Sequence, residues 1–278
     1  MTAKLSLCWG SMEGIGLVEL IKVAANAGFD AITVNSALYQ DALAEGLSDI
    51  DIAALLADNS VFVSGIDPLF NWLPSSVKLE GDDVMSRLTQ ASMQDIFDLA
   101  HVTGTNLVNA PLGLAVPDSE QQIIDCFATL CERAAAEQLR VSLEFMPFSQ
   151  VSNLKMAARI VEKANCHNGG LMFDCWHHHR AGGNPADILS VPGKKFFALQ
   201  LDDALQQPME DILDETLNHR ELPGEGCIDL VQTLRNLNNI GAELVYDVEV
   251  FKDSLRGETT AERARQLFES SQKVVEQL

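Results

Sequence analysis

Short apolar runs alternate along the chain with longer segments whose apolar residues recur every three or four positions. An apolar run of four to six residues indicates a buried parallel strand, and the longer period indicates an amphipathic helix. Strands are expected at 5–9, 31–35, 61–66, 106–111, 141–146, 171–174, 196–201 and 243–251. Helices are expected at 17–27, 42–58, 82–102, 118–138, 154–164, 228–238 and 259–277, with Asp118 as a candidate N-cap.

Strict alternation of strand and helix predicts a parallel sheet. Eight such units in 278 residues favour an α/β fold with a single closed (β/α)8 TIM barrel, spanning 1–278 as one domain. The chain has neither a GxGxxG motif nor a P-loop, which weakens the alternative of an open doubly wound sheet.

Four of the late strand candidates end near an acid or an amide: Glu144, Asp174, Gln200 and Glu249. Carboxyl ends of barrel strands meet at one mouth, and buried carboxylates need a partner. The all-oxygen set predicts a divalent metal, Mn2+, Mg2+ or Co2+ in preference, with Zn2+ left open. The plainer alternative is that each acid pairs with a neighbouring lysine or arginine.

A divalent ion at this mouth could polarise a ketone and stabilise an enediolate. Asp174 begins the segment DCWHHHR, whose adjacent histidines point in different directions, so only one is expected to face the site. His177 is that candidate, for hydrogen bonding to substrate or for proton transfer. Trp9 falls near the end of the first strand, where it could line a substrate-binding wall or simply pack in the core.

Charge and composition exclude several classes of partner. Aspartate and glutamate number 40 against 19 lysines and arginines, a net charge of -21, which disfavours nucleic acid and anionic membranes. No run approaches the roughly 20 apolar residues of a membrane span, and no secretory signal is expected. The six cysteines form no CxxC pair and are expected to be reduced thiols of a cytoplasmic protein. A homodimer is left open.

These residues resemble the xylose-isomerase-like barrels, the sugar phosphate isomerase/epimerase family, and the resemblance covers nearly the whole chain. Members commonly hold a metal through Glu, Asp, His and Glu at the ends of the last four strands. Glu144, Asp174 and Glu249 match three of these positions, and Gln200 stands where many members have histidine. An amide oxygen is a weaker ligand than imidazole, so the resemblance does not fix the metal.

Three segments resemble a branch of this family that includes 3-dehydroshikimate dehydratases: QLDDA (200–204), HRELPGEG (219–226) and EVFKDSLRG (249–257). This resemblance implies that His177 and Arg220 contact the substrate. A guanidinium at an acidic mouth could clamp a carboxylate or phosphate, with Pro223 and the adjacent glycines shaping its loop. The alternative is a surface ion pair of Arg220 with a nearby glutamate.

The first functional hypothesis is a metal-dependent isomerase or epimerase of a sugar, sugar phosphate or keto-cyclitol, working through an enediolate. Glu144 and Glu249 would then move the α-proton between the two faces. The second hypothesis is a lyase that dehydrates 3-dehydroshikimate or inosose, with His177 as acid or base. The substrate would be a sugar, a polyol or a cyclic keto acid. The family also resembles the apurinic endonucleases, but a DNA-cutting activity is disfavoured by the net charge of -21. A last hypothesis is a non-catalytic barrel that has lost its metal.

Overall fold

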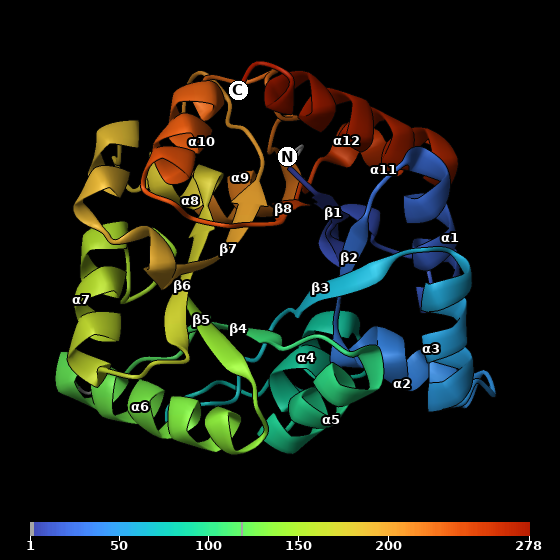
Figure 1. The fold of residues 1–278 in the computed structure, drawn as a ribbon, viewed down its shortest axis with the longest axis horizontal. Coiled ribbons are helices and arrows are strands. Elements are labelled where there is room, and N and C mark those ends of the chain that lie inside the picture. Colours follow the sequence, from blue (N-terminus) through green and yellow to red (C-terminus); the bar gives the residue numbers. More distant parts are fainter. Residues whose placement is uncertain (1–2, 118) are drawn as a thin grey trace.

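The strands of the protein form one closed parallel barrel surrounded by helices (Figure 1). The computed structural model describes residues 3–117 and 119–278. The strands follow chain order around the barrel, and the last pairs with the first through Leu5 and Tyr246. This confirms the predicted (β/α)8 TIM barrel.

The strands are β1 (Leu5–Leu7), β2 (Ala31–Val34), β3 (Phe62–Ile66), β4 (Leu107–Pro111), β5 (Arg140–Glu144), β6 (Gly169–Asp174), β7 (Phe196–Leu201) and β8 (Tyr246–Val248). The α-helices are α1 (Leu17–Ala27), α2 (Ser36–Ala44), α3 (Asp49–Asp58), α4 (Val84–Gln90), α5 (Met93–Thr103), α6 (Glu120–Ala136), α7 (Leu154–Ala164), α8 (Cys175–Arg180), α9 (Ile212–Asn218), α10 (Leu230–Asn239), α11 (Asp253–Arg256) and α12 (Thr260–Val275). Short 3-10 helices lie at η1 (Trp9–Met12), η2 (Pro185–Ser190) and η3 (Gly193–Lys195).

Two long helices predicted from the sequence are each divided in two, so the predictions for 42–58 and 82–102 were wrong in length. Gly46 adopts a φ of 99°, and Ser48 then begins α3 with a capping box. Ser92 begins α5 in the same way. A reciprocal cap satisfies amide groups that a continuous helix would satisfy internally, so it starts a new helix. The Asp118 cap lies outside the described residues, and Ser119 caps α6.

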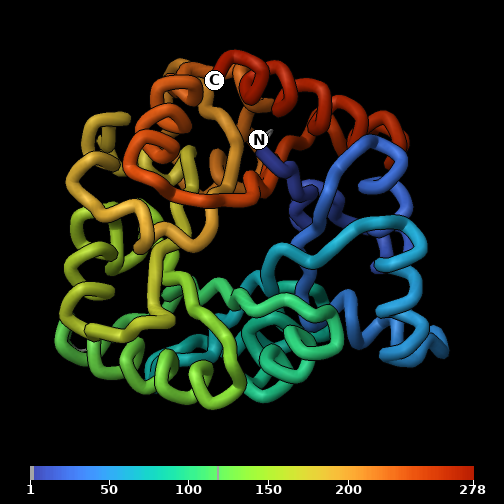
Figure 2. Tube along the Cα trace, viewed as in Figure 1, coloured from blue at the N-terminus to red at the C-terminus, as the bar shows by residue number. Residues whose placement is uncertain are grey.

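The last helix closes the outer ring against the first. Figure 2 shows the red α12 passing beside the blue α1. The rings of Phe29 and Phe268 meet edge to face with centroids 5.2 Å apart. Gly28 ends α1 with a φ of 104°, and a Cβ there would approach the Phe268 ring to 2.9 Å. A glycine is therefore required at this point for both the turn and the packing.

One level of the barrel interior is lined by polar side chains. The register of neighbouring strands places Asp174, Gln200, Asp247 and Ser6 at one level across β6, β7, β8 and β1. All four residues are buried. Barrel interiors are ordinarily filled by branched apolar side chains, so this level marks where the fold departs from simple packing. In the described part of the chain, no helix is long and apolar enough to span a membrane.

Candidate active site

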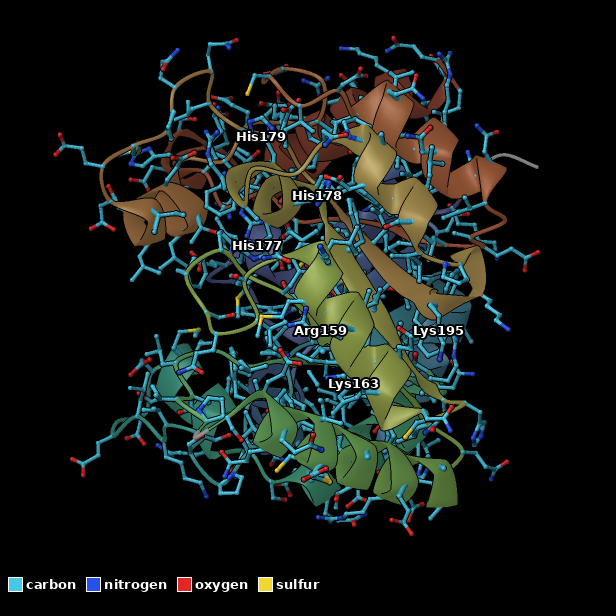
Figure 3. The ribbon with its side chains drawn as sticks, turned by 90° about the vertical axis from the view of Figure 1, so that its left-hand side faces the viewer. Arg159, Lys163, His177, His178, His179 and Lys195 are labelled. Atoms are coloured by element: carbon cyan, nitrogen blue, oxygen red, sulfur yellow. The ribbon has the colours of Figure 1, made fainter. Side chains whose placement is uncertain are left out.

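The four predicted strand-end residues lie at one end of the barrel, with His177 beside them. Figure 3 shows His177 near this end, whereas Lys195, which precedes β7, lies toward the opposite one. Glu144 ends β5, Asp174 ends β6, Gln200 lies in β7, and Glu249 directly follows β8. All of these side chains are buried. The carboxyl ends of the strands therefore gather them, as the barrel geometry requires.

His177 stands between two of the acids. Its Nε2 lies 3.5 Å from Glu144 Oε1 and 3.6 Å from Asp174 Oδ2. Asp174 caps α8, because its Oδ1 accepts a hydrogen bond from the backbone N–H of His177 at 2.6 Å. This cap fixes the first turn of α8 and so turns the imidazole toward the carboxylates. Despite burial, His177 and Arg220 hold the pKa of Asp174 below its usual value.

Gln200 and Glu249 form the second half of the site. Gln200 Nε2 donates to Glu249 Oε1 at 2.9 Å. The other amide atom, Oε1, is buried and has no hydrogen-bond partner among the described residues. A buried amide oxygen without a partner is costly unless something outside the chain satisfies it. Burial raises the pKa of Glu249 well above its usual value, with Asp67 and Asp174 adding to the effect and Arg220 opposing it.

Arg220 enters the site from the loop after α9. Its Nη1 donates to Asp174 Oδ2 at 2.9 Å, to Glu249 Oε2 at 3.1 Å, and to Asp202 Oδ2. Thr216 accepts from the remaining guanidinium nitrogens. The surrounding carboxylates raise the pKa of Arg220 against the opposing effect of its burial. The alternative of a surface ion pair is therefore wrong, because Arg220 is buried and its bonds run to acids of the barrel.

The loop that carries Arg220 is tied down by one carboxylate. Asp203 Oδ2 accepts backbone N–H bonds from Gly224 at 3.0 Å and Gly226 at 3.1 Å, and its Oδ1 accepts one from Ile228 at 2.9 Å. A Cβ at Gly226 would lie 2.4 Å from both Ala204 O and Asp203 Oδ1. The PGEG segment is thus glycine-rich because its backbone wraps a buried acid.

Sequence reasoning missed a further group beside the four predicted residues. Asp67 follows β3, and Asn109 lies in β4 and donates from Nδ2 to both Asp67 Oδ1 and Glu144 Oε2, each at 2.7 Å. Cys8 follows β1 and donates from Sγ to Glu249 Oε1 at 3.2 Å. Asp202, bonded to Arg220, was also missed. Asp67 and Asp202 directly follow apolar runs, so the signal that identified Asp174 also marks them.

Trp9 lies in η1, just after β1, as expected for a residue near the barrel mouth. The side chain is half-buried, and its buried Nε1 has no hydrogen-bond partner within the described residues. Burial and the charge of Glu144 raise the pKa of Asp67 to about 8. A role for Trp9 in lining the substrate-binding site stays a prediction.

The residues present fit a divalent cation. Ligand atoms of Glu144, Asp174 and His177 lie within 4.8 Å of one another, and Glu249 belongs to a separate group of that size with Cys8 and Asp67. Gln200 Oε1, which has no hydrogen-bond partner among the described residues, adds a neutral oxygen donor. Arg220 Nη1 donates to both Asp174 and Glu249, so the space between these two carboxylates attracts positive charge. Oxygen donors in this number suit Mn2+ or Mg2+, and Zn2+ and Co2+ accept them too.

Fold and site together define a class. The chain belongs to the xylose isomerase-like TIM barrel family, whose model matches residues 21–272. This confirms the resemblance drawn from the sequence. The fold also matches that of a crystal structure of an IOLI protein with a bound zinc atom, at a TM-score of 0.84 and 22% identity over 98% of each chain.

Within this family the chain is similar to enzymes of two kinds. It is 29% identical to a 3-dehydroshikimate dehydratase of Pseudomonas aeruginosa over 93% of this chain and 40% of the relative. It is 34% identical to an inosose isomerase of Bacillus subtilis over 51% of each chain. The chain thus spans about two fifths of the length of the dehydratase and half that of the isomerase.

Proposed function

We propose that the protein is a divalent-metal-dependent lyase that dehydrates a cyclic hydroxy-keto acid of the 3-dehydroshikimate type. The observation that carries the proposal is the pairing of Glu144 with His177 at 3.5 Å, while Glu249 is held by other groups. Glu249 Oε1 accepts from Gln200 and Cys8, and Oε2 accepts from Arg220. Glu144 Oε2 accepts from Asn109, which leaves Glu144 Oε1 and the neighbouring His177 Nε2 as the pair proposed for proton transfer.

Glu144, Asp174, Gln200 and Glu249 would hold the metal. Bound there, a divalent ion supplies Lewis-acid polarisation of the substrate carbonyl, which acidifies the adjacent C–H bond. Arg220 holds Asp174 and Glu249 in place through its Nη1. This arrangement fixes two of the four ligands before any ion arrives, which reduces the reorganisation that binding requires.

Dehydration needs one group to remove the α-proton and another to protonate the departing hydroxyl. In the proposed reaction Glu144 takes the proton from carbon, and His177 delivers a proton to the hydroxyl as the C–O bond breaks, releasing water. Asp174 Oδ2, 3.6 Å from His177 Nε2, stabilises the protonated imidazole. An epimerase would instead need bases on opposite faces of the substrate, and the bonds to Glu249 make it a poor second base.

The comparison favours the same reaction. The dehydratase matches extend over 93% of the chain, and the inosose isomerase matches extend over 49–57% of it. Isomerisation of an inosose-type keto-cyclitol remains the second candidate function. It is supported by the presence of two glutamates, Glu144 and Glu249, at the same mouth.

Incubating Mn2+-loaded protein with 3-dehydroshikimate tests the proposal. Loss of water from this substrate gives an aromatic catechol carboxylate, whose absorbance appears only if elimination occurs. We expect metal-dependent growth of that absorbance, absent after chelation and absent in Glu144→Gln. No catechol, together with interconversion of inososes by the same preparation, would establish the isomerase instead.

A further inference from the structure

A second cluster of ligand atoms lies next to the proposed metal site. Cys8, Asp67 and Glu249 come from the ends of β1, β3 and β8, and their ligand atoms lie within 4.8 Å of one another. All three are buried. Four-coordinate ions with bonds of about 2.0–2.3 Å need ligand atoms roughly 3.5 Å apart, so the cluster is near the size of a cation site.

The Cys8 thiol makes polar contacts rather than apolar ones. Cys8 Sγ donates to Glu249 Oε1 and accepts from the N–H of Gly10 at 3.4 Å. A cation held by Cys8 Sγ and the Glu249 carboxylate would take the place of the S–H proton that joins them now.

Asp247 supplies an independent observation. It lies at the level of Gln200 in the strand register, two residues before Glu249. Thr33 Oγ1 donates to its Oδ2 at 3.2 Å, while its Oδ1 is buried and without a hydrogen-bond partner in the described part of the chain. An unpaired buried carboxylate oxygen next to the Cys8 cluster points to a missing positive partner.

Charge balance points the same way. Besides Asp203, which is bonded to loop N–H groups, six buried carboxylates lie at this end of the barrel: Glu144, Asp174, Asp202, Glu249, Asp67 and Asp247. Arg220 and one divalent ion supply three positive charges between them. Arg220 donates to Asp174, Asp202 and Glu249, and no hydrogen bond or ion pair in the described part of the chain joins it to Asp67 or Asp247.

We propose that Cys8, Asp67 and Glu249, with Asp247 beside them, bind a second divalent cation, and that Glu249 is shared between the two ions. The thiolate makes this site softer than the all-oxygen site, so it favours Zn2+ or Co2+ over Mg2+. The inference rests on the proposed function in one respect, because Glu249 would be a ligand of both ions. Cys8 and Asp67 are not in the proposed ligand set of the first ion.

Cobalt loading followed by metal analysis and absorption spectroscopy tests the proposal, because a thiolate bound to Co2+ gives an intense near-ultraviolet charge-transfer band. We expect two Co2+ per chain and the band in the wild-type protein. Cys8→Ala should bind one Co2+ and lose the band, and Asp67→Asn should lower the affinity for the second Co2+. Cys131→Ala, which removes a buried thiol of α6, should retain both ions and the band.

The failures of the two proposals are distinguishable. One Co2+ per wild-type chain and no thiolate band would overturn the second site and leave the first intact. Two ions in Cys8→Ala would also overturn it, since the second ion would then lie elsewhere. Two ions with a thiolate band but no dehydration of 3-dehydroshikimate would support the second site and contradict the proposed reaction.

Discussion

His177 Nε2 lies 3.5 Å from Glu144 Oε1, and both side chains are buried at the mouth of the barrel. We predict that His177→Asn and Glu144→Gln each lower kcat by roughly 10²–10⁴-fold, the usual contribution of a general acid or base. Steady-state kinetics measures this change. His179→Asn is the matched control, because His179 contacts Cys227 Sγ at 3.4 Å, and it should stay within a few-fold of wild type. Near-wild-type kcat in His177→Asn would remove the histidine from the mechanism.

Arg220 is predicted to be a structural cation as well as part of the site. Replacing it with alanine leaves Asp202 buried beside Asp174 without its charged partner. We expect Arg220→Ala to lower the free energy of unfolding of the metal-free protein by roughly 3–5 kcal/mol, as for a broken buried pair. Urea unfolding measures the loss. Arg265→Ala, which breaks exposed pairs on α12, should change stability little, and equal losses in both variants would contradict the assignment.

Gln200 is predicted to bind metal through its partnerless oxygen. Gln200→Ala should weaken Mn2+ binding by about tenfold or more, which equilibrium dialysis can follow. Gln200→His should bind Zn2+ more tightly relative to Mn2+, because imidazole suits Zn2+ better than an amide does. Gln94→Ala, on the exposed surface of α5, controls for a general effect. Unchanged Mn2+ affinity in Gln200→Ala would exclude the amide as a ligand.

The metal-free protein should lose stability as pH rises. Burial, with the charge of Glu144, raises the pKa of Asp67 from 3.8 to about 8, and burial raises that of Asp247 to about 7. Between these values the folded state retains protons that the unfolded chain has released, so the free energy of unfolding falls with increasing pH. Urea midpoints at about pH 5 and about pH 8 measure the slope. Asp67→Asn should reduce the dependence of the urea midpoint on pH. An unchanged dependence would assign the loss of stability to groups other than Asp67.

The sequence allowed the barrel and the four strand-end residues to be predicted, because both follow from local patterns. An apolar run that ends on a carboxylate is visible without a structure, and alternation with helices fixes which ends meet. The breaks at Gly46 and Ser92 escaped prediction, since the apolar period continues across them. Arg220 could be singled out, but not its bonds to three buried acids, because the path of its loop depends on Asp203 accepting backbone N–H groups.

The central claim is that Glu144, Asp174, Gln200 and Glu249 hold one divalent ion. A crystal structure of Mn2+-loaded protein, with an anomalous difference map calculated at the manganese edge, tests it most directly. The account predicts a peak about 2 Å from an oxygen of each of the four side chains. A peak bound by His177 in place of Gln200, or no peak at this mouth, would contradict it.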